Sequence, residues 1–317
     1  MTTIACIPYR RESNSRRIVM NSDAILTVGS IAIDWLEMPD GTEGEVLGGS
    51  ATYFILTASQ FAPVHVVGVV GSDFPQEGHD LYKIHTANLD DLQVVDGKTF
   101  RWGGRYHENW ENRTTLFTEL GVFGDFKPAI SQGNRSCPFV FLANIQPSLQ
   151  LDVLGQMEPP KLVITDTMNL WIETALIDLK KVIAKTDIFL LNNNEAEKLT
   201  GLSDPEGAGR ELCRQGPKSV VVKLGSRGAL LVEEERTVPV AAYKIDSVVD
   251  PTGAGDSFAG GLVGALSAGD SLIDALIVGS AIASFSVEGF GPAGLFNLDK
   301  DELAQRISVV RNLSKLA

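Results

Sequence analysis

Cysteine is scarce in this chain of 317 residues, which contains Cys6, Cys137 and Cys213 and no others. Three widely spaced cysteines argue against a disulfide framework and indicate reduced thiols in a cytoplasmic protein. The four histidines show no metal-ligand spacing, and the patterns CxxC and HExxH are absent, so the common zinc sites are not expected. No apolar run approaches the roughly 18 residues of a transmembrane helix.

Basic residues are also few, because 27 Lys and Arg stand against 40 Asp and Glu, a formal charge of −13. Phosphate backbones attract basic surfaces, so neither nucleic acid nor an anionic membrane is an expected partner. A small phosphorylated ligand stays compatible, since it needs only a local positive site. The polar, basic segment 1–22 lacks the apolar core of a secretory signal, and we expect a flexible tail there.

Apolar β-rich runs alternate with helical periodicity along residues 23–317. Six such runs predict buried strands: Ile25–Ser30, Val64–Val70, Phe139–Ala143, Leu162–Thr165, Asp187–Leu191 and Ser219–Leu224. Alternation of this kind predicts one α/β domain with three layers, in which a doubly wound, mostly parallel sheet lies between two layers of helices.

Two stretches, at about 36–47 and 98–123, interrupt this alternation. Both carry exposed polar residues, and in the second Trp102, Tyr106 and Trp110 punctuate the polar sequence. We interpret the two stretches as strands of a small β-sheet that projects from the domain as a lid; the alternative is a pair of long surface loops. Arg101 and Arg105 alternate with the aromatic residues, and either reach a phosphate or are solvated.

The segment Asp250–Leu266, DPTGAGDSFAGGLVGAL, joins a strand to a helix through a glycine-rich turn. Gly253 and Gly255 permit positive φ and close backbone approach. The first N–H groups of the helix lack intrahelical partners and lie at the positive end of its dipole, which predicts an anion-binding cradle. Asp256 fits such a site as a base that takes a proton from an attacking hydroxyl. It also fits as an ordinary helix cap.

Other glycine-rich motifs are missing, since neither GxxxxGK[ST] nor a GxGxxG after the first strand is present. DPTGAGD instead resembles the C-terminal signature of the ribokinase-like, PfkB-type family of carbohydrate and nucleoside kinases, and the resemblance extends from about Ala24 to about Leu316. It implies a ribokinase-like fold and transfer of a phosphoryl group from ATP, with Mg²⁺, to an alcohol. It also implies that Asp256 is the catalytic base and that Gly253, Ala254 and Gly255 form the anion hole.

Shorter elements agree with this resemblance in their order and separation. It implies that Gly48 and Gly49 form the glycine pair at the lid hinge and that Asp34 binds substrate hydroxyls. It implies that the nucleotide lies against Asn194, Lys223, Gly225, Gly228 and Thr252. It further implies that Glu197, at the end of an NxxE motif beginning at Asn194, acts on Mg²⁺ through water, and that Asp250 helps to hold a monovalent cation such as K⁺.

Three departures from the ribokinase pattern concern the substrate. Tyr53 replaces an Asn that follows the glycine pair, Ala32 replaces another Asn, and Gln146, with Asn144 beside it, replaces an acid. A buried hydroxyl without its partner costs roughly 1–3 kcal/mol, so these changes argue against ribose. Tyr53 makes the chain more similar to the inositol-kinase-like branch, which favours a cyclitol such as myo-inositol.

Other residues and partners follow from the same reasoning. Asp166 and Asn169 follow a predicted strand at the edge where ligands gather, and touch either substrate or Mg²⁺. A nucleoside acceptor is an alternative if Trp102, Tyr106 or Trp110 stacks on a base, although these rings equally fit packing within the lid or at a dimer interface. We expect a homodimer through the lid. The alternative from another class is a non-catalytic sugar or nucleotide sensor, which would have no need of Asp256.

Overall fold

The structure, a computed structural model, describes residues 23–108, 110 and 113–315, so the tail expected at 1–22 lies outside the described residues. Within these residues nine strands form one sheet in the order β13-β12-β11-β10-β9-β8-β1-β4-β5. The strands are β1 (Ile25–Val28), β4 (Val64–Gly71), β5 (Leu92–Val95), β8 (Phe139–Leu142), β9 (Leu162–Asp166), β10 (Ile188–Asn192), β11 (Ser219–Lys223), β12 (Ala229–Glu233) and β13 (Thr237–Val240). The run from β11 to β5 is parallel, while β12 and β13 are antiparallel additions at one edge.

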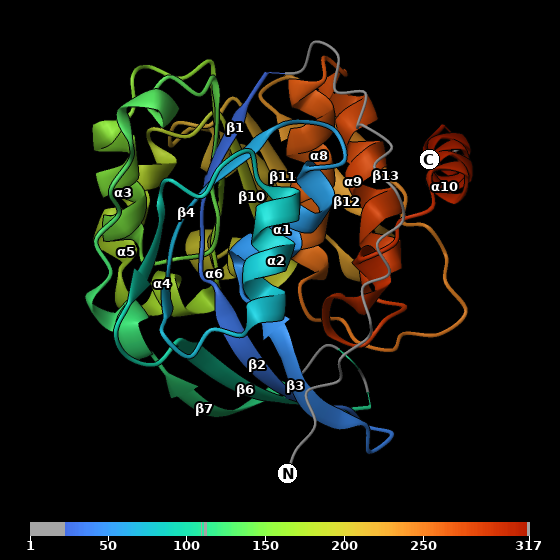
Figure 1. Ribbon diagram of the computed structural model, residues 1–317. Helices are drawn as coiled ribbons and strands as arrows, with labels where there is room; N and C mark the ends of the chain where they lie inside the picture. Colours follow the sequence, from blue (N-terminus) through green and yellow to red (C-terminus); the bar gives the residue numbers. More distant parts are fainter. Residues whose placement is uncertain (1–22, 109, 111–112, 316–317) are drawn as a thin grey trace.

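Helices cover both faces of this sheet (Figure 1). One layer contains α1 (Ser50–Ala58), α2 (Gln76–His85), α8 (Ala254–Ser267) and α9 (Leu272–Ser286), with α10 (Lys300–Ser314) outside α9. The other contains α3 (Pro147–Gln156), α4 (Asn169–Thr174), α5 (Leu176–Ile183), α6 (Asn193–Thr200) and α7 (Pro205–Cys213). Strand alternation divides the core between the layers, since Ile25 packs into the first cluster and Leu26 and Val28 into the second.

The three-layer α/β prediction is confirmed, and each of the six predicted strands is present with ends shifted by at most two residues. Two elements escaped sequence reasoning. β5 is a short edge strand with exposed residues, so it lacks the apolar run of its neighbours. Helix α6 follows β10 without a loop, because the Asn192 side chain accepts the Glu195 N–H while the Glu195 carboxylate accepts the Asn192 N–H.

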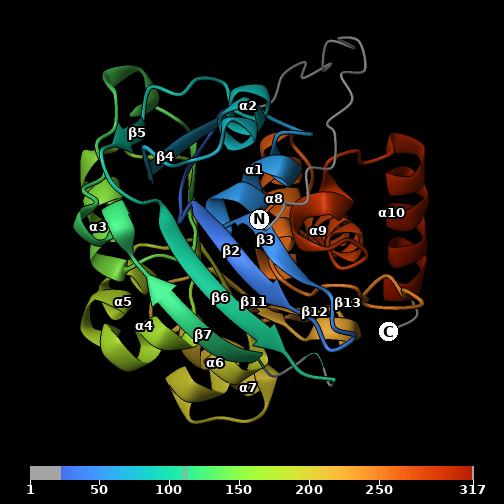
Figure 2. The same cartoon turned by 60° about the horizontal axis from the view of Figure 1, so that its bottom comes forward.

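A second sheet, the lid, has the order β3-β2-β6-β7 and lies across one end of the main sheet (Figure 2). Its strands are β2 (Ala32–Glu37), β3 (Glu43–Gly48), β6 (Phe100–Tyr106) and β7 (Arg113–Glu119). Two hairpins meet through parallel pairing of β2 with β6, so these stretches are strands and not loops. Because β2 begins at Ala32, earlier than the polar pattern indicates, Asp34 belongs to the lid.

Close packing of α8 on α1 holds the glycine-rich turn beside the sheet. A Cβ added at Gly260 would lie 1.9 Å from the Thr57 hydroxyl, so only glycine permits this contact. The pairing places Tyr53, on α1, beneath the N-terminus of α8. Within the described residues no helix is both long enough and apolar enough to span a bilayer.

Candidate active site

Charged and polar side chains gather where parallel strands end. Asp166, Asn192 and Lys223 are the last residues of β9, β10 and β11, three neighbouring strands. Parallel strands present their carboxyl ends at one edge of the sheet, which is where ligands bind in open α/β folds. The lid lies over this edge, and its connections to β1 and α1 start beside it (Figure 1).

The N-terminus of α8 forms a rigid cradle at this edge. Gly253 caps the helix with φ 72°, and a Cβ there would lie 2.3 Å from the Tyr53 ring. The fully buried Asp250 fixes the turn, because its two carboxylate oxygens accept the N–H groups of Thr252 at 2.8 Å and Gly291 at 2.7 Å. The first-turn amides of α8, including those of Gly255 and Asp256, therefore form a preorganised donor group for an anion.

Asp256 lies in the first turn of α8 and faces other charges. Burial, reinforced by the neighbouring Asp166 carboxylate, raises its pKa from 3.8 to about 7 against the opposing effects of Lys223 and Arg113. A carboxyl group with a pKa near the working pH is suited to general base catalysis, because it is partly ionised and still accepts a proton readily. This favours the base over a simple helix cap.

Asp34 approaches the same space from the lid. Its side chain is buried at 4% exposure, the Gly49 N–H donates to its carboxylate, and burial raises its pKa to about 7. A Cβ at Gly48 would lie 1.9 Å from Asp34 Oδ2, so the glycine pair makes room for the carboxylate. The nearby Tyr53 hydroxyl is buried without a hydrogen-bond partner among the described residues. These groups are placed to meet a polar ligand.

The other end of the site is built around Lys223. Its ammonium lies 2.6 Å from Asp166 Oδ2 and contacts Gly255, whose Cβ position would be 3.2 Å away. Gly225 and Gly228, both with positive φ, form the turn that follows β11. A Cβ at Gly228 would lie 2.0 Å from the Val240 carbonyl oxygen, so this turn also requires glycine.

The inner face of the lid carries aromatic rings. Tyr106 accepts a hydrogen bond of 3.0 Å from the Thr252 hydroxyl, which ties the lid to the α8 turn. The Trp102 ring lies against Gly104, and the Arg113 guanidinium lies 5.1 Å from the ring centroid. The charge of Arg113 lowers the pKa of both Asp34 and Asp256, so this lid cation acts electrostatically on both carboxylates.

Comparison with known proteins shows the family to which the chain belongs. Residues 153–297 match the pfkB family of carbohydrate kinases. Mouse ribokinase (Mus musculus) is 36% identical over 308 residues, which cover 88% of this chain and 93% of that protein. The chain belongs to the PfkB carbohydrate kinase family. It is an enzyme of the kinase class, as its sequence resemblance implied.

Another curated relative resembles the chain in sequence, and solved structures resemble it in fold. The cytidine kinase of Thermococcus kodakarensis is 28% identical over 264 residues, covering 80% of this chain and 92% of that protein. The solved nucleoside kinase of Methanocaldococcus jannaschii has a TM-score of 0.75 and 21% identity, covering 91% of this chain and 99% of that one. A putative ribokinase II from E. coli has a TM-score of 0.78 and 19% identity, with coverage of 92% and 99%. The ribokinase-like fold is thereby confirmed.

Within the PfkB framework the NxxE motif that faces the site begins two residues earlier than the sequence suggested. Asn194 and Glu197 are both exposed on α6 and are not brought to the group around Asp256. Glu195 is buried, its pKa is raised to about 7 mainly by burial, and its charge interacts with Lys223 and Asp166. The capping box with Asn192 sets the helical phase that turns Glu195 inward and Glu197 outward.

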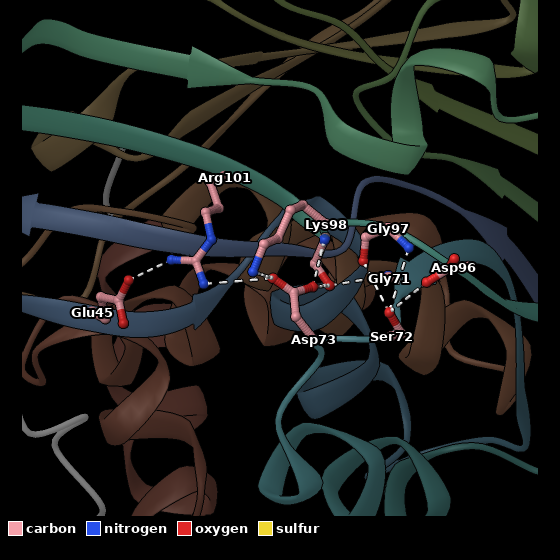
Figure 3. A network of polar contacts seen from close by, with 9 residues as sticks. Glu45, Gly71, Ser72, Asp73, Asp96, Gly97, Lys98 and Arg101 are labelled. Carbon is pink, nitrogen blue, oxygen red and sulfur yellow. Dashed lines mark hydrogen bonds and ion pairs between the residues drawn. The ribbon is translucent and has the colours of Figure 1, made fainter.

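Arg101 also lies away from the site. It pairs with Ile33 in register while Trp102 pairs with Asp34, so Arg101 occupies the opposite, outer face of the lid. There its guanidinium contacts Glu45 at 2.5 Å and Asp73 at 3.8 Å, within the polar network at the base of the lid (Figure 3). The inward arginine is Arg113, seven residues beyond Tyr106 and paired with it across the β6–β7 hairpin.

The remaining substrate candidates, at the carboxyl edge of the sheet, differ in their exposure and in their hydrogen-bond partners. The side-chain oxygen of Asn144 already has a partner, because it accepts a hydrogen bond from the Trp171 indole N–H at 2.8 Å. Gln146 is exposed at the N-cap position of α3. The side-chain oxygen of Asn169 is buried and has no hydrogen-bond partner among the described residues, so it is the one of the three placed to meet a ligand.

Proposed function

We propose that this kinase transfers the γ-phosphate of ATP to an alcohol group of a small polyhydroxy substrate. The acceptor is a sugar, a cyclitol such as myo-inositol, or a nucleoside. The observation that carries the proposal is the position of Asp256, with its pKa raised to about 7, in the first turn of α8 and facing Asp34 of the lid. The carboxylate takes the hydroxyl proton. The amides that follow Gly253 donate hydrogen bonds to the phosphoryl oxygens and so stabilise their negative charge.

The residues of this chain fit a nucleoside triphosphate together with Mg²⁺. The α8 cradle and Lys223 supply positive charge for phosphates, and Gly225, Gly228 and Thr252 line the turns beside them. Among the described residues no group of three His, Cys, Asp or Glu forms a ready metal site. Mg²⁺ itself keeps several waters and takes few protein carboxylates. Glu195 is the carboxylate best placed to act through such water. When bound, Mg²⁺ neutralises charge on the phosphates.

The acceptor end of the site is formed by Asp34, Tyr53 and the glycine pair, with Asn169 at the sheet edge. Asp34 orients a substrate hydroxyl toward Asp256, and the unpartnered Tyr53 hydroxyl gives a second polar contact. Closure of the lid through Tyr106 and Thr252 excludes water, which limits hydrolysis of ATP. Buried polar groups of this kind select substrates strongly, because an acceptor lacking the matching hydroxyl leaves them unpaired.

A coupled assay of ADP release tests this function over a panel of sugars, cyclitols and nucleosides. We expect turnover with at least one alcohol and loss of most of it in the Asp256→Asn variant, which should still bind nucleotide. Absence of ADP production with every acceptor would support the alternative of a non-catalytic sensor.

A nucleoside acceptor has specific support from the inner face of the lid. Trp102, Tyr106 and Trp110 belong to one cluster there, in which Tyr106 is buried and the two tryptophans are half-buried. Rings of this kind stack on bases. Relatives of this chain include a cytidine kinase and a nucleoside kinase. The discriminating comparison is kcat/KM for cytidine, inosine and adenosine against ribose and myo-inositol. A preference for the free sugar or cyclitol would exclude the nucleoside.

Two further parts of the proposal concern assembly and cations. The outer lid exposes all of β7, including Leu116 and Phe117, which supports a homodimer through the lid. Light scattering at micromolar concentration tests the homodimer, and a monomer at that concentration would contradict it.

Asp250, which organises the α8 turn, is the residue we assign to a K⁺ site. Equal activity in K⁺ and in a bulky organic cation would contradict that assignment.

A further inference from the structure

Lys223 and Asp166 form a buried ion pair beneath the catalytic turn. They end β11 and β9 and reach each other across β10, with 2.6 Å between Lys223 Nζ and Asp166 Oδ2. Their side chains are 18% and 4% exposed. The second Asp166 oxygen accepts the Thr167 N–H at 2.8 Å. The backbone therefore holds the carboxylate, and the carboxylate holds the ammonium.

The ammonium lies directly against the anion cradle. A Cβ at Gly255 would be 3.2 Å from Lys223 Nζ. Lys223 also acts electrostatically on Asp256 and Glu195, because its charge lowers the pKa of each carboxyl group. Its cation thus lies at the first turn of α8, where phosphate charge is expected, and acts on both the proposed base and the carboxylate assigned to the metal.

Stability alone does not account for this arrangement. Removing two charges from water costs several kcal/mol per ion, and a buried pair is often no more stabilising than well-packed apolar residues. The chain offers the contrasting pair Lys218–Asp187, where the lysine side chain is 82% exposed and the Nζ–Oδ1 distance is 2.9 Å. That pair lies at the opposite end of β11, where it joins the segments before β10 and β11 without burying a lysine.

We propose that Lys223 contacts the phosphoryl group during transfer and that Asp166 is its positioning residue. The proposal rests on the phosphotransfer function given above. In the step, the acceptor hydroxyl gives its proton to Asp256 while its oxygen forms a bond to the γ-phosphorus. The bond from that phosphorus to the β–γ bridging oxygen breaks, and ADP leaves. Lys223 keeps its proton throughout and supplies charge where the cradle lacks basic side chains.

A double-mutant cycle tests the pair. Lys223→Met should lower kcat by about tenfold to a hundredfold, the usual effect of one charged hydrogen-bond donor. Asp166→Asn should lower kcat by a smaller factor, because the ammonium remains but is no longer fixed. The double variant should be no slower than Lys223→Met alone. Multiplying losses would show that Asp166 acts on substrate or metal by itself, and would overturn the proposal.

Nucleotide affinity provides a readout that does not need turnover. Lys223→Met should weaken a non-hydrolysable ATP analogue about tenfold more than it weakens ADP, as measured by calorimetry. Equal weakening of both nucleotides would place Lys223 away from the terminal phosphate and overturn its assigned role. If wild type phosphorylates no acceptor, the proposed function fails, yet this affinity ratio is still decided separately.

Controls separate a local effect from misfolding. Lys223→Met leaves Asp166 buried without a partner, whereas the double variant removes both charges and should unfold near the wild-type temperature. Lys223→Arg keeps the charge and should restore part of kcat. Lys218→Met breaks the exposed pair and should leave kcat and the affinity ratio unchanged; equal losses in Lys218→Met and Lys223→Met would contradict a site-specific role.

Discussion

The two faces of the lid use charge differently. On the outer face Arg105 contacts Glu37 at 2.5 Å and Arg101 contacts Glu45 at 2.5 Å. On the inner face, within the described residues, no ion pair joins Asp34 or Arg113 to another side chain. Strand alternation sends neighbouring residues to opposite faces, so a single strand, β2, carries both Asp34 and Glu37.

This difference separates structural charges from functional ones. Exposed ion pairs contribute little to stability, typically 0–1 kcal/mol, and their removal is tolerated. Asp34 accepts the Gly49 N–H and Arg113 lies over the Trp102 ring, so neither charge has an opposite charge as its partner. A buried charge such as Asp34 that no opposite charge neutralises is costly unless a ligand satisfies it, which indicates binding or catalysis. The comparison predicts that matched substitutions on the two faces have unequal effects.

The largest effect is expected at Asp256, toward which the inner face points. Asp256→Asn should lower kcat by about 10²–10⁴-fold, the usual contribution of a positioned general base. Its thermal unfolding temperature should not fall, because the change removes a half-buried carboxylate that lies near Asp166. Steady-state kinetics and calorimetry measure both quantities. A kcat within fivefold of wild type would contradict the assignment of the base.

A second test compares two carboxylates of β2. Asp34→Asn should lower kcat/KM for the acceptor by about tenfold to a hundredfold, because a hydrogen bond to a charged group is lost, while KM for ATP stays near wild type. Glu37→Gln, three residues away on the outer face, should change both values less than twofold. Similar losses in the two variants would remove the functional distinction between the faces.

A third, smaller effect is expected for the arginines. Arg113→Met should lower kcat/KM about tenfold, because the cation near Asp34 and Asp256 is lost. Arg105→Met should leave kcat/KM close to wild type, since Arg105 contacts Glu37 on the solvent side. The reverse order of effects would show that the outer arginine serves the site.

The smallest effect concerns pH and stability. The pKa of Asp256 is raised from 3.8 to about 7, so the folded protein binds more protons than the unfolded chain between these values. Stability from this group is therefore present at low pH and is lost as pH rises toward 7. The pKa of Glu37 is lowered, mainly by its hydrogen bond from Arg105, so its contribution is lost as pH falls.

Calorimetric unfolding from about pH 3 to 7.5 measures this dependence. The decline toward pH 7.5 should be shallower in Asp256→Asn than in wild type, whereas Glu37→Gln should alter only the acid end. Activity should move the other way, with kcat/KM rising through about pH 7 as the base ionises. Parallel stability curves for wild type and Asp256→Asn would show that Asp256 does not titrate in this range.

Sequence reasoning could predict those parts of the candidate site that lie in continuous motifs. The turn from Asp250 to Asp256 is recognisable as a cradle from its glycines at 253 and 255 and its helix start, although its contacts with Tyr53 and Gly291 are not. Sequence reasoning was less successful where the outcome depends on which residues of a helix, or which face of a strand, point into the site. Glu197 and Glu195 look equivalent in NNNEAEKLTG, and only the capping box on Asn192 settles which one turns inward.

The lid shows the same limit. Polar spacing located its strands, yet it did not say that Arg101 faces out and Arg113 faces in. That choice depends on the parallel pairing of β2 with β6 and on the register of the β6–β7 hairpin, which joins residues through backbone hydrogen bonds. A shift of one residue would exchange the two faces, and no local propensity encodes that register.

The sequence by itself determined the α/β alternation, which follows from local periodicity, and it predicted the glycine-rich anion cradle from backbone freedom. Its spacing left Asp256 open between a base and a helix cap, and the base remains a prediction that the family resemblance implies. Only the tertiary structure decided which charges surround that base. Asp34, Lys223 and Asp166 come from strands far apart in the chain, and burial in a shared space raises the pKa of Asp256. Burial and proximity are properties of packing, so the chemistry of the site emerges only when the sheet edge, α8 and the lid meet.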